Sequence, residues 1–180
     1  MSTSTPASST LPDNEESVKA LTDLLDGFLK NSATLKDVRG LTNENMEAVY
    51  SVGYSLYTNG KFEDSEKIFQ FLCLFDHLER KYWLGLGGSR QMLKQYDRAV
   101  EAYAYAALLD ISDPTAASRA ADCHIALGKL TEAESSLTAA VEFSRGKPEH
   151  EKIFERSSAL LELVQKKLGE AAPATAETAS

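Results

Sequence analysis

A repeat of 34 residues runs through the middle of this 180-residue chain and restricts its fold more than any other feature. Residues 46–79, 80–113 and 114–147 align with one another without an insertion or a deletion. A fixed period of this length is typical of proteins that stack similar helical hairpins, because one hairpin buries its apolar face only against its neighbours. We therefore predict an all-α fold in which three tandem hairpins form a right-handed superhelix.

Small and large residues occupy fixed positions in this repeat. Small residues at the eighth and twentieth positions allow the two helices of a hairpin to approach closely. These residues are Gly53, Gly87, Ala121, Ser65, Ala99 and Ala133. Large residues at the twenty-fourth position fill the space between hairpins, and they are Phe69, Tyr103 and Leu137. Gly60, Lys94 and Gly128 mark the turn inside each hairpin. The pattern resembles the tetratricopeptide repeat.

The segments that flank the repeats divide into helical and disordered parts. Residues 1–13 and 170–180 are rich in Ser, Thr, Pro and Ala, so we predict that both are disordered. Residues 14–45 form a predicted N-terminal helical region, and residues 148–169 form a predicted C-terminal capping helix. Apolar residues recur at helical spacing in the N-terminal region, and this stripe consists of Val18, Leu21, Leu24, Leu25, Phe28 and Leu29.

Two local signals place helix starts within the third repeat. Asp113 followed by Pro114 predicts an N-cap with proline at the first helical position. Thr131 and Glu134 have the spacing of a capping box.

Composition excludes several classes of partner and of chemistry. A net charge of -8 disfavours contact with nucleic acid and with anionic membranes. No apolar run approaches the roughly 20 residues that span a bilayer, so we expect no membrane insertion and a cytoplasmic protein. Cys73 and Cys123 form no CxxC pair and suit a reducing compartment.

The inner face of the predicted array carries the candidate binding site. The first helix of each hairpin faces inward, and positions 2, 5, 9 and 12 of the repeat share one stripe of that helix. The stripe consists of Glu47, Tyr50, Tyr54, Tyr57, Lys81, Leu84, Gly88, Gln91, Thr115, Ser118, Asp122 and Ile125. Its three tyrosines predict a peptide groove, because tyrosine offers a large contact area at low entropic cost. Alternatively, the tyrosines cover the core or the N-terminal helix.

Several segments resemble the class II chaperones of bacterial type III secretion. They read ATLKDV at 33–38, EAVYSVGY at 47–54, GKFED at 60–64, IFQFLCLFDH at 68–77 and WLGLG at 83–87, and the resemblance extends from Leu21 to Leu168. It implies a chaperone that keeps one or two hydrophobic, pore-forming translocator proteins soluble in the bacterial cytosol before export. It also implies that the groove binds an extended translocator segment with spaced Pro and Leu anchors.

The resemblance assigns roles to particular residues. Tyr50, Tyr54 and Tyr57 match groove aromatics of that family, and residues 84, 88 and 91 match the neighbouring helix. The apolar N-terminal stripe matches the helix that often mediates dimerisation, which implies a homodimer in the absence of cargo. Some members of the family also bind a transcriptional regulator, and no residue here decides whether this chain does so.

Three rival functions remain as alternatives. A generic adaptor would bind another protein's peptide, but a carboxylate clamp of the heat-shock adaptor type requires Lys and Asn where Tyr50 and Tyr54 stand, and only Arg119 fits it. An enzyme lacks support, since Cys123 and His124 diverge by about 100° on a helix. The GLGG run at 85–88 lacks a preceding strand. We therefore predict neither catalysis nor a cofactor or metal site. The third alternative, a fragment of a larger assembly, is disfavoured by the predicted capping helix.

Overall fold

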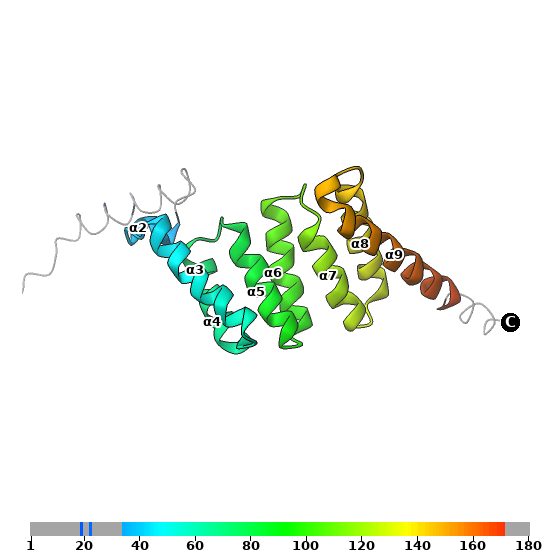
Figure 1. Ribbon diagram of the computed structural model, residues 1–180, viewed down its shortest axis with the longest axis horizontal. Coiled ribbons are helices and arrows are strands. Elements are labelled where there is room, and N and C mark those ends of the chain that lie inside the picture. The colour runs from blue at the N-terminus through cyan, green and yellow to red at the C-terminus, as the bar shows by residue number, and fades with distance from the viewer. Residues whose placement is uncertain (1–18, 20–21, 23–33, 172–180) are drawn as a thin grey trace, which may run out of the picture. The chain divides into compact units, whose positions relative to one another are not determined.

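Every regular element in the described part of the chain is helical (Figure 1). The computed structural model describes residues 19, 22 and 34–171. The chain divides into two units, and the boundary between them in the sequence follows Leu41. The first contains the single helical turn α2 (Leu35–Val38), where the backbone N–H and the hydroxyl of Thr34 both donate to the Asp37 carboxylate at 2.8 Å.

The predicted dimerisation stripe lies outside the described residues. It comprises Val18, Leu21, Leu24, Leu25, Phe28 and Leu29. Lys19 and Thr22, which are described, are helical and exposed.

The second unit consists of three helical hairpins and a long final helix. The hairpins are α3 (Asn43–Thr58) with α4 (Phe62–Phe75), α5 (Arg80–Met92) with α6 (Tyr96–Leu109), and α7 (Thr115–Ala126) with α8 (Leu130–Ser144). A 3-10 turn, η1 (Pro148–His150), leads into α9 (Glu151–Ala171). From α3 to α8 each helix packs against the next, and α9 packs against α8 (Figure 1). The predicted all-α repeat fold is confirmed in these residues.

The turns inside the hairpins occur at the predicted position of the repeat. Gly60 and Gly128 adopt φ angles of 74° and 71°, a left-handed conformation that glycine tolerates without steric cost. Lys94 occupies the same position in the second repeat with φ of 60°, the one non-glycine residue of the described chain in that region.

The two predicted helix starts in the third repeat need correction. The predicted capping box of Thr131 and Glu134 is wrong, because α8 already begins at Leu130. Its N-cap residue is Lys129, whose side chain forms no capping hydrogen bond. Helix α7 begins one residue later than predicted, with Pro114 at the N-cap. Asp113 still contributes, because its carboxylate accepts a bond of 2.8 Å from the backbone N–H of Thr115.

The core between hairpins follows the predicted alternation of small and large residues. Ser65, Ala99 and Ala133 are fully buried, as are Phe69 and Leu137. The Ser65 hydroxyl donates to the carbonyl of Gly53 at 3.0 Å, which satisfies its polar atom at the contact between α3 and α4.

A buried carboxylate joins the first two hairpins. Glu66 of α4 accepts a hydrogen bond from Nε of Arg90 at 3.1 Å and forms an ion pair with Arg98 at 3.2 Å. Gln70 also donates to it, at 3.0 Å. Since Glu66 and Arg90 are mostly buried, each depends on the other to offset its desolvation.

Helix α9 covers the open side of the last hairpin. Its residue Val164 is buried in a cluster with Leu137 and Ala133. A bond of 2.6 Å between Arg156 and Asp122 connects α9 to α7. No helix in the described part of the chain combines the length and the apolar character that a bilayer crossing requires.

Candidate peptide-binding groove

A hollow of about 230 Å³ lies on the inner side of the first helices. It brings together six of the predicted groove residues from α3 and α5, which are Tyr50, Tyr54, Tyr57, Lys81, Leu84 and Gly88. Thr115 of α7, which also belongs to the predicted stripe, lines it as well, together with Phe69, Gly85, Tyr103 and Arg119. The three tyrosines, which span two turns of α3, therefore face the glycine-containing part of α5.

The tyrosine wall is accessible rather than part of the core. Tyr54 is 55% exposed, and Tyr50 and Tyr57 are half-buried. The rings of Tyr50 and Tyr54 stack with centroids 6.3 Å apart, while Tyr50 meets Phe69 edge-on at 5.8 Å. Partial burial raises the pKa of Tyr50, so its phenol remains a hydrogen-bond donor at neutral pH. The wall combines a flat apolar surface with hydroxyl groups.

Lys81 is held at the edge of this wall. Its ammonium group pairs with Glu47 and lies 4.7 Å from the centre of the Tyr50 ring. The hydrogen bond that Lys81 donates to the Glu47 carboxylate raises the pKa of Lys81, which keeps it charged. The pair thus places a fixed cation against an aromatic face, a contact that orders the tyrosine.

Two glycines of α5 bring aromatic rings from second helices to the floor of the hollow. A Cβ atom at Gly85 would lie 2.3 Å from the Phe69 ring, and one at Gly87 would lie 2.6 Å from the Tyr103 ring. Close packing therefore explains Gly87, in agreement with its small-residue position in the repeat. Sequence reasoning missed Gly85, Phe69 and Tyr103 as groove residues. The available signal was three glycines in one helix, since helical glycine is costly unless something approaches closely.

Gly88 is different, because space is available there. A Cβ atom at this position would lie 3.4 Å from the nearest atom, Cε2 of Tyr57, an ordinary contact. Packing within the chain therefore does not require glycine at position 88. Because Gly88 has no side chain, backbone is accessible at the surface of the hollow.

Five predicted groove residues lie outside this hollow. The Glu47 carboxylate forms an ion pair with Lys81, and the Gln91 side chain accepts a hydrogen bond of 2.8 Å from the Tyr103 hydroxyl. Ser118 is buried against Ser157 of α9, and Asp122 pairs with Arg156. Ile125 packs on the core cluster of the last hairpin. The third repeat therefore contributes Thr115, which was predicted, and Arg119, which was not, while α9 packs over part of its predicted stripe.

The arrangement is suited to binding. Both cysteines are buried, and burial raises the pKa of each thiol to about 12, so neither supplies a thiolate at neutral pH. The described residues contain no cluster of three potential metal ligands.

Comparison with known proteins connects this architecture to a family. Residues 81–113 match the tetratricopeptide repeat model. The low calcium response locus protein H of Yersinia pseudotuberculosis is 38% identical over 143 residues, which cover 79% of this chain and 85% of that protein. One chain of a T3SS complex from Aeromonas hydrophila superposes with a TM-score of 0.79 at 35% identity, covering 82% of this chain and 98% of that one.

Two crystal structures of the Yersinia enterocolitica chaperone SycD are also similar. One, in complex with a peptide of the translocator YopD, has a TM-score of 0.68 at 40% identity and covers 71% of this chain and 97% of that one. The other, described as an alternative dimer, has a TM-score of 0.67 at 39% identity and covers 71% and 96%. Agreement of sequence and of fold over most of each relative shows that the chain belongs to the family of type III secretion translocator chaperones.

Proposed function

We propose that this protein binds one or two hydrophobic translocator proteins in the bacterial cytosol and keeps them soluble until export. The observation that carries the proposal is the accessible tyrosine wall of Tyr50, Tyr54 and Tyr57 above a floor of glycine backbone and buried rings. The complex of SycD with a peptide of the translocator YopD, at 40% identity, supports the same role here.

The shape of the hollow favours an extended segment with apolar anchors. Gly88 presents backbone without a side chain, so a peptide main chain has room to approach α5 there. An apolar side chain between the tyrosines would then be surrounded by aromatic surface. Arg119 and the tyrosine hydroxyls provide donors for the carbonyl groups of such a segment.

Masking one aggregation-prone segment requires only binding energy, so the proposed function includes no catalysis. Release of the cargo then depends on the export machinery. In the absence of cargo we propose a homodimer, which the dimeric structure of SycD supports. A transcriptional regulator as a further partner stays a hypothesis.

Co-expression with candidate pore-forming translocators, followed by affinity purification and limited proteolysis, tests the proposal. A protected extended segment should remain bound. The double variant Tyr50→Ala with Tyr54→Ala should weaken its binding by about 2 kcal/mol, roughly 30-fold in Kd, without unfolding the protein. Tyr105→Ala is the matched control, because it removes a tyrosine of similar exposure from α6 rather than from the groove.

Capture of a different soluble protein, with no translocator held, would contradict the chaperone role and favour the generic adaptor. Equal affinity of the double variant and the wild type would contradict the placement of the groove while leaving the chaperone role intact.

A further inference from the structure

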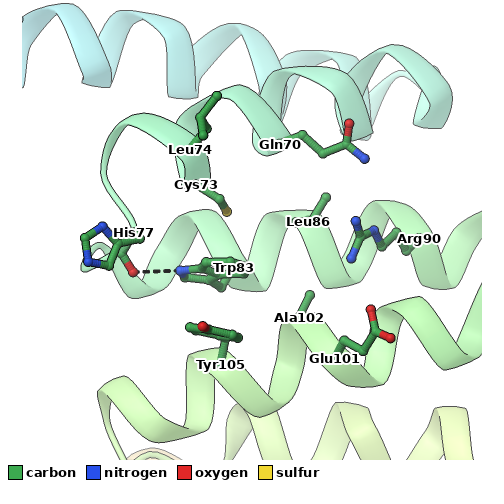
Figure 2. Close-up of a pocket in the computed structure, with 10 residues that line it drawn as sticks. All are labelled: Gln70, Cys73, Leu74, His77, Trp83, Leu86, Arg90, Glu101, Ala102 and Tyr105. Carbon is green, nitrogen blue, oxygen red and sulfur yellow. Dashed lines mark hydrogen bonds between the residues drawn. The ribbon is translucent and has the colours of Figure 1, made fainter. Parts of the chain in front are cut away.

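A second and larger hollow lies on another side of α5, outside the groove (Figure 2). It encloses about 540 Å³ between α4, α5 and α6. Figure 2 shows Trp83 and Leu86 of α5 along its floor, with Leu74 of α4 and Tyr105 of α6 on opposite sides. Neither Trp83 nor Leu86 lines the groove, so the two hollows use different faces of one helix.

Large apolar side chains border this outer hollow and extend into solvent. Leu74 and Tyr105 line the hollow and are 65% and 51% exposed. Leu108 does not line it, but follows Tyr105 by three residues in α6 and is 80% exposed. Such a concentration on one surface is typical of interaction sites. The Trp83 ring stacks on Tyr105 with centroids 4.4 Å apart, and its indole N–H donates to the carbonyl of His77 at 2.8 Å. The aromatic pair is therefore already ordered.

The repeat itself provides an internal comparison. Leu74 and Leu108 occupy the same position in the first and second repeats, and the third repeat has Glu142 there. Glu142 is exposed and α8 folds into the same helix. The hairpin therefore does not require an apolar residue at this position. We conclude that the two leucines serve something other than the fold.

The charges at one end of the outer hollow indicate the partner's chemistry. Glu101 lines that end, and it forms no ion pair with any described residue. The neighbouring Arg90 is already engaged by the Glu66 carboxylate and by the carbonyl of Arg98. With a net charge of -8 on the whole chain, the open carboxylate favours a cationic partner.

We propose that this outer hollow docks an amphipathic helix of a partner protein. The helix presents apolar residues at i, i+3 and i+4 to Leu74, Trp83 and Leu108, with a Lys or Arg beside them that pairs with Glu101. A helix fits because α4 and α6 form two ridges with a channel between them, and the described chain offers no strand edge for β-addition. The groove remains open to its cargo, so both sites are occupied together.

Trp83 is the only tryptophan of the chain and lies in the outer hollow, so its fluorescence reports directly on occupancy. The probe is a tryptophan-free peptide of Leu and Lys with helical spacing, about as long as the 14 residues of α4 or α6. Titration should change the Trp83 emission saturably. A peptide with Glu in place of each Lys should bind at least about tenfold more weakly.

Three variants decide which surface the probe occupies. Leu74→Gln with Leu108→Gln keeps the charge and should weaken binding roughly tenfold. Glu101→Gln should weaken it a few-fold and reduce its dependence on salt. Tyr50→Ala with Tyr54→Ala, which alters only the groove, should leave the affinity unchanged.

Equal binding of the wild type and the leucine variant, or loss of binding in the groove variant, would overturn the proposal. So would equal binding of the acidic peptide. If the variant Leu74→Gln with Leu108→Gln halves the molecular mass that light scattering gives for the free protein, the surface binds a second copy of the chain instead, and the proposal is refuted. Competition between the probe and a bound translocator segment would also refute the proposal. If only the chaperone function were wrong, the titration followed by Trp83 fluorescence would be unchanged.

Discussion

Two glycines in the same helix should respond to alanine in opposite directions. Both Gly85 and Gly88 lie inside α5, where replacing glycine with alanine stabilises a helix by about 0.5–1 kcal/mol. At Gly88 the new Cβ atom would lie 3.4 Å from Tyr57, an ordinary contact. We therefore expect Gly88→Ala to raise the free energy of unfolding by about 0.5–1 kcal/mol.

At Gly85 the added Cβ atom would overlap the ring of Phe69, with three ring atoms within 2.6 Å. The ring has little room to retreat, because Phe69 is 1% exposed and Tyr50 contacts it edge-on. Overpacking of this kind costs about 1–3 kcal/mol. After the helix-propensity gain is subtracted, Gly85→Ala should lower the free energy of unfolding by about 1–2 kcal/mol.

Urea unfolding followed by circular dichroism measures both variants against the wild type. The predicted separation between them is about 2 kcal/mol, well above the error of such a comparison. Gly85→Ala should also weaken the binding of a translocator segment, since Phe69 forms part of the groove floor. Equal stability of the two variants would refute the argument, because it would mean that the Phe69 ring moves aside without cost.

Three further predictions concern the fold and the assembly. Glu66→Ala should destabilise the protein by about 3 kcal/mol, because it leaves a buried arginine unpaired, whereas removal of the exposed Asp64 should change urea stability by less than about 0.5 kcal/mol. Burial lowers the pKa of His124, so the unfolded chain takes up a proton first as pH falls below about 6.5. Stability should then decrease toward acid pH, and less steeply in His124→Gln; parallel curves would contradict this. Deletion of residues 1–31 should halve the cargo-free mass in light scattering, and a constant mass would exclude the N-terminal stripe as the dimer contact.

Some residues of the candidate groove could be predicted from the sequence, and others could not. The tyrosines at 50, 54 and 57 were predictable, because their spacing of four and three residues puts them on one face of a single helix. Ser118 and Asp122 have the same spacing, yet α9 packs over them through Ser157 and Arg156. The periodicity of one helix carries no information about which later segment covers it.

The sequence by itself determined the repeat, its turns and its small and large positions, because these depend on local helix geometry repeated every 34 residues. Only the tertiary structure decided the depth and the floor of the groove. Phe69 and Tyr103 belong to second helices, and they reach the hollow because Gly85 and Gly87 of α5 have no side chains to block them. The tertiary structure also brings the Trp83 and Tyr105 rings together on another surface. These are contacts between different helices, which depend on how hairpins stack and not on the order of residues within any one of them.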